Sequence, residues 1–490
     1  MRAVVIGAGL GGLATGLRLQ AEGHEVVVVE QRARPGGRAY RLRDEGFSWD
    51  TGPSLLTMPW VLEGAFAAGG LDLAREVDLV RLDPMYRIRW AGEERHLDFV
   101  DDPDRLAEEV RRFSARDARR VPELLAALEP IYRHAIVGAG SRPFLSAADF
   151  ARLVPTMVRL DALRPLHSFV SRYVEHPRVR EAFSFHSLFI GGDPFRVPAI
   201  YGALVYLQVL DGGWYAKGGL YSIVEAMARP LDVRHGEPVE AIEHRGGRAH
   251  AVRLAGGERI PADVVVSNAD VLLAHRLLGR RPPLRRLRPT MSCFLLYLGL
   301  ERSFPELLHH TLLVGPGYRE FIRTVTRGHG IAPTLSTYVH APSRTEAAMA
   351  APGGDSVSVL LPVPNLRARV DWDRESDRLR DALIEDMERS YGLTGLSASV
   401  RVEHRMTPVD FARELGAAWG NAFSIEPTLS QSAYFRQPNR DRRVRNVYYV
   451  GGGTHPGAGV PGVLMGARVT GDLIAADHPA RRRTPARAVG

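Results

Sequence analysis

The chain has 490 residues, too many for one simple hydrophobic core, so about three domain-sized units are expected. Its 45% apolar and 24% charged residues are typical of a globular protein, its single cysteine, Cys293, excludes an internal disulfide, and no window of about 20 apolar residues predicts a transmembrane helix. The formal net charge is +8, and nearly all the basic residues are arginine, since Lys217 is the one lysine. Codon bias is a simpler explanation of the arginine content than nucleic-acid binding, for which no motif is present. The positive charge still favours contact with an anionic membrane surface.

The first 38 residues carry the strongest pattern in the chain. A short apolar run at residues 3–6 leads into a glycine-rich turn, followed by a helical pattern and a second apolar run that closes on Glu30. Strand, glycine turn, helix, strand and acid is the order that a dinucleotide-binding unit requires. Gly7 allows a tight turn, Gly9 lets the backbone approach a pyrophosphate, and Gly12 lets helix and strand pack closely. The helix N-terminus is expected to meet the phosphate charge, and Glu30 the ribose hydroxyls.

The residues after Glu30 indicate which dinucleotide binds. Gln31 is followed closely by the turn Gly36-Gly37-Arg38. An acid followed by such a turn resembles the flavin enzymes of the amine oxidase and desaturase superfamily, in which the turn backbone and its guanidinium approach the FAD phosphates. An ordinary surface turn is the alternative. FAD is therefore the expected cofactor.

The segments that follow mix strands and helices. Residues 54–80 have helix-like apolar spacing, and residues 86–90 and 95–99 alternate as the two strands of a hairpin. Residues 101–128 form an amphipathic pattern that predicts a long helix, interrupted near Pro122.

Residues 144–215 are helical in pattern, aromatic and unusually apolar. One interpretation is the buried core of a helical subdomain, and this must hold in part. The other interpretation adds that the segment lines an apolar channel or forms a surface patch that inserts into the membrane.

The second half of the chain returns to strands. A helix predicted at 221–231 precedes strand-like runs at 238–242 and 262–269, and residues 291–410 alternate strands with helices. Residues 444–465 again read as strand, glycine turn and helix. A flavin domain is therefore expected to be assembled from separated segments of the chain.

Motifs are spread along nearly the whole chain. The most specific is Gly453-Thr454-His455-Pro456-Gly457-Ala458-Gly459-Val460-Pro461-Gly462. The others are residues 7–12, 36–38, 182–193, 309–311, 338–342, 422–427 and 431–436. Together they resemble the bacterial-type phytoene desaturases, a carotenoid desaturase family of FAD-dependent amine oxidase-like oxidoreductases.

The resemblance implies an α/β fold. A Rossmann-type FAD-binding domain assembled from discontinuous segments is expected beside a sheet-containing substrate domain and a helical, membrane-facing subdomain. The expected boundaries are 1–80, 220–290 and 420–478 for the FAD-binding domain, 81–100 and 291–419 for the substrate domain, 101–219 for the helical subdomain, and 479–490 for a basic, disordered tail.

The resemblance also assigns residues to the cofactor. Those expected to bind FAD are Gly7, Gly9, Leu10, Gly11, Gly12, Glu30, Gln31, Gly36, Gly37, Arg38, Val239, Gly453, Thr454, Gly462, Val463 and Leu464. Many members of the wider superfamily carry an acid where this chain has Thr454, so a flavin contact there is a hypothesis. The helix that begins near Gly462 is expected to direct its N-terminus at the flavin ring. No metal is expected.

The candidate catalytic residues are Asp149 and Arg152. They lie three apart in the run 144–152, so on a helix they share a face. The resemblance suggests a role for this pair near the flavin, and a surface ion pair is an equal alternative. His455 lies in the flavin-binding turn and is expected to order its backbone rather than to act as a base.

The activity implied by the resemblance is stepwise dehydrogenation of phytoene or a related C40 precursor towards neurosporene or lycopene. The alternatives are desaturation of another polyene (hydroxylated, C30 or non-carotenoid) and redox-neutral carotenoid isomerisation. A non-enzymatic isoprenoid-binding protein is disfavoured, because both ends of a flavin site are present. No second dinucleotide fingerprint appears, so a membrane quinone or dioxygen is the expected electron acceptor. The protein is expected in the cytoplasm, peripherally on a membrane, with its oligomeric state open.

Overall fold

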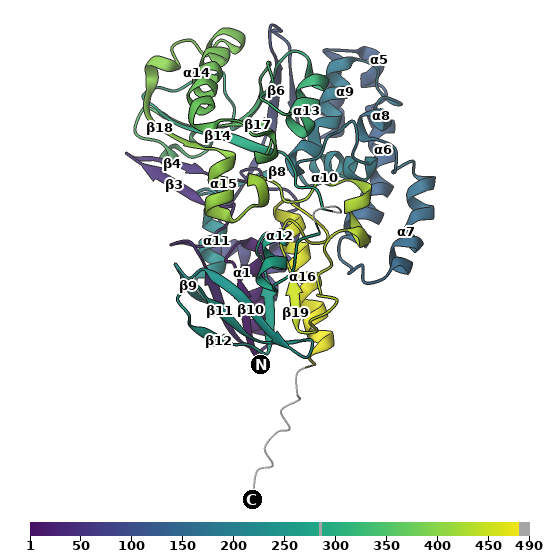
Figure 1. Cartoon of the computed structure of the whole chain (residues 1–490). Helices are drawn as coiled ribbons and strands as arrows, with labels where there is room; N and C mark the ends of the chain where they lie inside the picture. The colour runs from purple at the N-terminus through teal and green to yellow at the C-terminus, as the bar shows by residue number, and fades with distance from the viewer. Residues whose placement is uncertain (284–286, 480–490) are drawn as a thin grey trace, which may run out of the picture.

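The computed structural model describes residues 1–283 and 287–479; the predicted tail lies almost wholly outside this part. Its lower layer in Figure 1 is a five-stranded sheet in which all the paired strands are parallel. The strands in spatial order are β19 (Val447–Tyr449), β13 (Val264–Ser267), β1 (Arg2–Ile6), β2 (Glu25–Glu30) and β9 (Asp232–His235). Segments from both ends and the middle of the chain thus form one sheet.

The two faces of this sheet are covered differently. On one face, Ala3 and Val5 pack into the main core with α1 (Leu10–Ala21) and α16 (Val460–Asp477), two helices that contact each other. On the other face, Val4 and Ile6 pack against a three-stranded antiparallel sheet. Its strands are β10 (Val239–Arg245), β11 (Arg248–Leu254) and β12 (Arg259–Pro261). Strands buried on both faces explain the continuous apolar runs of the sequence.

A second, seven-stranded sheet lies above the first in Figure 1. Its strands in spatial order are β18 (Val400–Met406), β14 (Ser292–Leu300), β17 (Asp355–Val363), β16 (Ser336–His340), β15 (His310–Val314), β6 (Tyr86–Trp90) and β7 (His96–Phe99). The hairpin predicted at residues 86–99 is present as β6 and β7, and it joins the sheet through a parallel pairing of β6 with β15. Three helices accompany this sheet: α13 (Tyr318–Arg327), α14 (Trp372–Tyr391) and α15 (Pro408–Leu415).

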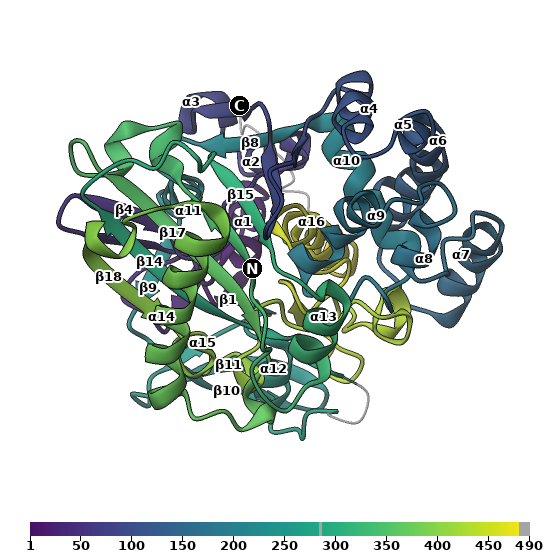
Figure 2. The ribbon, with the colours of Figure 1, turned by 90° about the horizontal axis from the view of Figure 1, so that it is seen from above.

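Helices fill the other side of the molecule, as Figure 2 shows. They are α4 (Pro103–Arg111), α5 (Ala115–Ala118), α6 (Val121–Ile131), α7 (Ala147–Arg159), α8 (Leu166–Val170), α9 (Pro177–Ser184) and α10 (Ala203–Asp211). The remaining helices are α2 (Pro59–Ala68), α3 (Leu73–Glu76), α11 (Tyr221–Ala228) and α12 (Val271–Leu277), and the remaining strands β3 (Arg41–Asp44), β4 (Phe47–Asp50), β5 (Leu79–Leu82) and β8 (Gly213–Ala216). Among the described residues, no helix combines the length and apolarity needed to cross a bilayer.

The long helix predicted over residues 101–128 is instead three helices, α4, α5 and α6. The Asp102 side chain caps the start of α4 by accepting from the N–H of Arg105. A second cap begins α5, where the Ser114 hydroxyl accepts from the N–H of Asp117. Pro122 then lies in the first turn of α6, where its missing N–H costs nothing. The break before α6 agrees with the interruption predicted near Pro122. The amphipathic spacing continues across the first break, between α4 and α5, and did not reveal it.

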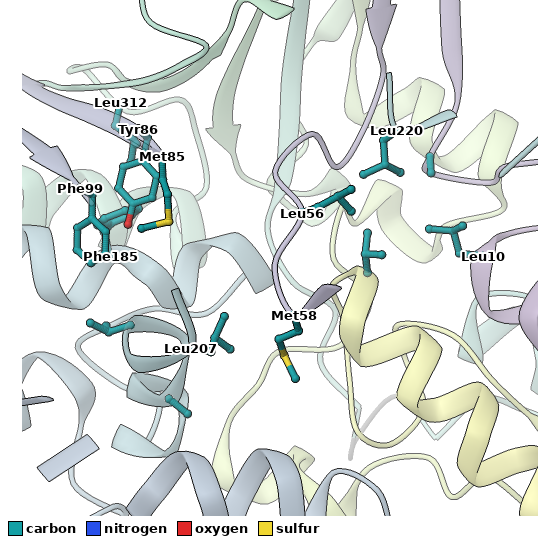
Figure 3. Packing of buried hydrophobic residues seen from close by; sticks show 14 of the residues in the cluster. Leu10, Leu56, Met58, Met85, Tyr86, Phe99, Phe185, Leu207, Leu220 and Leu312 are labelled. Atoms are coloured by element: carbon teal, nitrogen blue, oxygen red, sulfur yellow. The ribbon is translucent and has the colours of Figure 1, made fainter. Parts of the chain in front are cut away.

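An aromatic cluster joins the hairpin to the helical part. Tyr86 stacks on Phe99 with ring centres 5.0 Å apart and meets the Phe185 edge at 5.7 Å. Figure 3 shows these three rings together, with Met58 further along beside the start of α16. The Tyr86 hydroxyl bonds to His186 and Gln208, so its polar end is satisfied although the ring is fully buried.

Asp441 anchors the chain just before β19. Its carboxylate accepts hydrogen bonds from the Arg280 guanidinium at 2.6 Å, the Tyr449 hydroxyl at 2.7 Å and the backbone N–H groups of residues 443 and 444. Burial alone would raise the pKa of Asp441, but these donors outweigh it and lower the pKa to about 2. The bonds therefore favour the charged carboxylate of the folded state.

We predict that Asp441→Asn lowers the free energy of unfolding by about 2 kcal/mol at neutral pH, because the charged hydrogen bonds are lost and Arg280 is left unpaired. The folded pKa lies below the value of about 3.9 for an unfolded aspartate, so the stabilisation is complete above that pH and is lost as the pH falls towards 2. Denaturant unfolding of both proteins across this range would show the difference narrowing in acid. The exposed Asp381→Asn is the control and should change little. Equal effects of the two substitutions would contradict the prediction.

Candidate flavin and substrate site

One large cavity, of about 900 Å³, lies where the two sheets and the helical part meet. Its walls include the glycine turn after β1, the end of β2, the turn at residues 36–38 and the first turn of α16. The carboxyl ends of parallel strands share one sheet edge, which is where such folds bind ligands. The separated motifs of the sequence therefore meet around a single space.

The start of α1 has the features of a phosphate site. Gly9 is its N-cap, and its first turn contains no acidic side chain. A Cβ atom at Gly12 would lie 2.2 Å from the carbonyl oxygen of Gly7, so only glycine permits the observed packing of helix on turn. The N–H groups of this turn and the helix dipole favour an anion.

The turn after β2 meets the first glycine turn. Gly36 has a φ of +124° and donates its N–H to the carbonyl oxygen of Ala8, which fixes the two turns side by side. The Glu30 carboxylate is buried at the end of β2 and accepts from the N–H of Ala8 at 2.8 Å and of Arg32 at 2.9 Å. Glu30 also lines the cavity, so its carboxylate lies at the surface that the sequence analysis assigns to the ribose.

Two arginines present positive charge to the cavity. Arg38 donates through Nη2 to the Asn421 side chain at 3.1 Å, while its buried Nε has no hydrogen-bond partner in the described chain. Arg436 is buried and donates to the carbonyl oxygens of Gly452 and Ile425, and its Nε likewise has no partner among these residues. Burial lowers the pKa of both guanidinium groups, which remain charged. An anionic ligand would compensate them.

The first turn of α16 forms another part of the cavity wall. Gly453, Gly462 and Val463 line the cavity, whereas Thr454 and Leu464 are buried outside it. His455 lines it too; its Nε2 bonds to the carbonyl oxygen of Ala139 at 3.1 Å, and burial lowers the pKa of its imidazole to about 4. A neutral histidine that bonds to backbone supports an ordering role for His455.

Most of the predicted cofactor residues line this cavity. Those that line it are Gly7, Gly9, Leu10, Gly11, Glu30, Gln31, Gly36, Gly37, Arg38, Val239, Gly453, Gly462 and Val463; Gly12, Thr454 and Leu464 lie behind the wall. Three residues that the sequence analysis gave no role also belong to the site: Arg436, Asn268 and Ser424. The run 431–436 stood among the motifs, but nothing in it indicated that Arg436 would be buried against the glycine turn.

The rest of the cavity wall is apolar. Helix α7 contributes Phe150, Leu153, Val154 and Met157, and α10 contributes Leu204 and Leu207. On the other side the wall comes from the seven-stranded sheet and α13 through Leu312, Leu313, Val314, Phe321 and Ile322. The apolar segment 144–215 thus supplies wall as well as core. Such a surface suits a long hydrocarbon, which offers nothing to hydrogen-bond.

The structure places Asp149 and Arg152 away from this wall. Both lie on α7, where Asp149 forms a capping box with Ser146 and accepts from Arg152 at 3.1 Å. The Arg152 side chain is 78% exposed, and neither residue lines the cavity. Hydrogen bonds from Ser146 lower the pKa of Asp149, which disfavours proton uptake there. A catalytic role for the pair stays a prediction, and the geometry supports the ion-pair alternative.

Comparison with known proteins agrees with this geometry. The family model of the flavin containing amine oxidoreductases matches residues 10–474. The chain is 39% identical to a lycopene-forming phytoene desaturase of Paracoccus sp., with 97% of each chain covered. It is 35% identical to a neurosporene-forming phytoene desaturase of Cereibacter sphaeroides, covering 98% of this chain and 96% of the relative. An oxidoreductase of known structure from Methanosarcina mazei superposes with a TM-score of 0.65 at 18% identity, over 95% of this chain and 99% of that one.

The fold and the site define an FAD-dependent oxidoreductase. The chain belongs to the flavin containing amine oxidoreductase family, since the family model spans nearly all of it. The residues present suit a dinucleotide: a helix N-terminus without acidic side chains, a glycine turn with no room for a Cβ atom, and two arginines whose Nε atoms have no hydrogen-bond partner in the described part of the chain.

We predict that Gly12→Ala reduces the flavin bound per purified chain about tenfold or more, because the new methyl group displaces the turn that meets the phosphates. Gly64→Ala is the matched control: Gly64 also lies within a helix, α2, and a Cβ there would meet no atom within 4 Å. Flavin absorbance divided by protein concentration measures the ratio. Full flavin content in Gly12→Ala would refute the assignment of this turn.

Proposed function

We propose that this protein is an FAD-dependent desaturase that introduces conjugated double bonds into phytoene or a related C40 carotenoid precursor, towards neurosporene or lycopene. One observation carries the proposal: the turns that suit a dinucleotide and a long apolar wall belong to the same cavity. The names of the Paracoccus and Cereibacter relatives indicate the substrate class, because the likeness extends over almost the full length of each chain.

The residues of the chain act mainly by positioning. Bound FAD supplies the hydride acceptor, and the protein holds a hydrocarbon against it at a defined depth. Because the apolar wall forms no directional bonds with such a substrate, shape and water exclusion must set its register. Residues of the first turn of α16 line the cavity, and a helix N-terminus at this position would stabilise negative charge. The sixteen residues assigned to FAD in the sequence analysis form the proposed cofactor site.

The overall reaction is balanced by an external acceptor. Each step removes a hydride and a proton from adjacent substrate carbons, and two electrons then pass to a quinone or to dioxygen. No base is assigned: His455 is neutral and bonded to backbone, and Asp149 lies outside the wall.

We predict coloured products when the FAD-loaded protein is incubated anaerobically with phytoene liposomes and a quinone. Chromatography with absorption detection counts the new conjugated bonds, and omitting the quinone should limit turnover to about one step per flavin. A redox-neutral isomerase would shift the retention time without lengthening the conjugated chromophore. If phytoene is recovered unchanged while bound FAD is verified, the assignment of a C40 substrate is contradicted. The other polyenes would then be tested.

We further propose that α7 and the neighbouring segment 429–435 contact the membrane from which the substrate enters. Figures 1 and 2 show this segment beside α7 at the margin of the molecule. Phe150 of α7 lines the cavity and packs edge-on against Phe435, which is 49% exposed. Leu145, Val158 and Leu429 are further exposed apolar side chains here, and the exposed Arg152 and Arg159 suit anionic headgroups. The apolar cavity wall therefore continues to an apolar outer surface.

We predict that the double variant Leu429→Ser and Phe435→Ser binds anionic vesicles about tenfold more weakly, because two apolar side chains no longer enter the bilayer. Val409→Ser is the control, since Val409 is 42% exposed on α15, away from α7 in both views. Vesicle co-sedimentation measures binding, and detergent-solubilised phytoene should restore turnover of the double variant. Equal vesicle binding by all three proteins would contradict the proposed membrane surface.

A further inference from the structure

Three buried histidines meet where strand β15 begins and strand β16 ends. His309 precedes β15, His310 is its first residue, and His340 is the last residue of β16. The antiparallel register places His310 directly opposite His340, so their side chains share one face of the sheet. One side-chain nitrogen from each of the three residues lies within 4.8 Å of the others. None of the three is more than 6% exposed, and none lines the cavity.

The outer ring nitrogens of two histidines are held by hydroxyl groups. Nδ1 of His309 lies 2.6 Å from Oγ1 of Thr345, and Nδ1 of His310 lies 2.7 Å from the hydroxyl of Tyr338. These bonds fix the ring orientations and leave both Nε2 atoms to the interior of the cluster. Partners of this kind on the second ring nitrogen are the rule for metal-binding histidines.

The inner nitrogens are only partly accounted for by hydrogen bonding. Nε2 of His309 and Nε2 of His340 are 3.3 Å apart, while Nε2 of fully buried His310 has no partner among the described residues. A buried polar atom without a partner costs about 1–3 kcal/mol. In a tetrahedral zinc site with Zn–N bonds of about 2.0–2.1 Å, two ligand nitrogens are separated by about 3.3–3.4 Å. The observed 3.3 Å separation is therefore also a ligand-to-ligand distance.

We propose that His309, His310 and His340 bind one zinc ion through their Nε2 atoms. A water molecule would take the fourth position of a tetrahedral ion. The ion would join the ends of β15 and β16 and satisfy the unpartnered His310 Nε2. Its role is structural, since the histidines lie outside the cavity wall.

A tyrosine links the histidine cluster to a carboxylate. The Tyr215 ring packs edge-on against His309 at 4.6 Å, and its hydroxyl donates to the Glu346 carboxylate.

Metal analysis of the FAD-loaded protein, purified without chelators or an affinity metal, tests the proposal. We expect about one zinc per chain in the wild type and about a tenfold lower content in His310→Gln and His340→Gln. His186→Gln is the control, because His186 is also fully buried but lies outside the cluster. Flavin content in each variant reports folding independently of metal.

Cobalt substitution in the wild type covers the case in which the variants fail to fold. Removal of zinc with a chelator should lower the melting temperature, and added Co²⁺ should restore it and give the visible absorption of a nitrogen-ligated, four- or five-coordinate ion. Less than about a tenth of a metal ion per chain, with no thermal shift on adding zinc, would overturn the proposal. So would zinc retained by a well-folded His310→Gln variant. These readouts do not depend on which polyene the enzyme desaturates.

Discussion

The packing of the first helix on its own glycine turn is the constraint on which the rest of the structure depends. Gly12 sits so close to the carbonyl of Gly7 that no side chain fits between them, and Asn268 at the end of β13 donates to the same carbonyl at 3.3 Å. The turn is thus fixed by a residue more than 250 positions away. Because β13 pairs with β19, the C-terminal glycine turn is held beside it. A pyrophosphate site made of backbone needs this rigidity, since backbone donors cannot adjust as side chains do.

The cavity joins two kinds of recognition that need different chemistry. At the glycine turns, helix N-termini and the guanidinium groups of Arg38 and Arg436 form a polar, positively charged end. Beyond them the wall is hydrocarbon, drawn from α7, α10 and the seven-stranded sheet. An ionic ligand can be held by a few directional contacts, whereas an apolar chain is positioned only by the shape of a long surface. This explains why the apolar wall extends over several helices and a sheet.

Local patterns in the sequence predicted local structure well. The strand–turn–helix at residues 2–21, the hairpin at 86–99 and the helix that begins at Tyr221 depend on spacing between neighbours, and the structure contains each of them. The prediction was wrong where a cap overrides periodicity, as at Ser114. It also missed contacts that only the fold creates. Nothing adjacent to Arg436 announces that its guanidinium lies beneath the C-terminal glycine turn, and His340 lies about thirty positions from its two neighbours in the histidine cluster.

The histidine cluster and the cavity share one face of the seven-stranded sheet. Tyr338 and His340 are two apart on β16 and therefore point to the same side. Tyr338 lines the cavity, bonds to the Ser54 hydroxyl at 2.8 Å and contacts Nδ1 of His310. A metal ion held by His310 would fix that imidazole and, through it, the tyrosine hydroxyl in the cavity wall. An ion with no contact to substrate would then still determine the shape of the surface against which the substrate lies, because in a close-packed interior the position of one ring constrains the next.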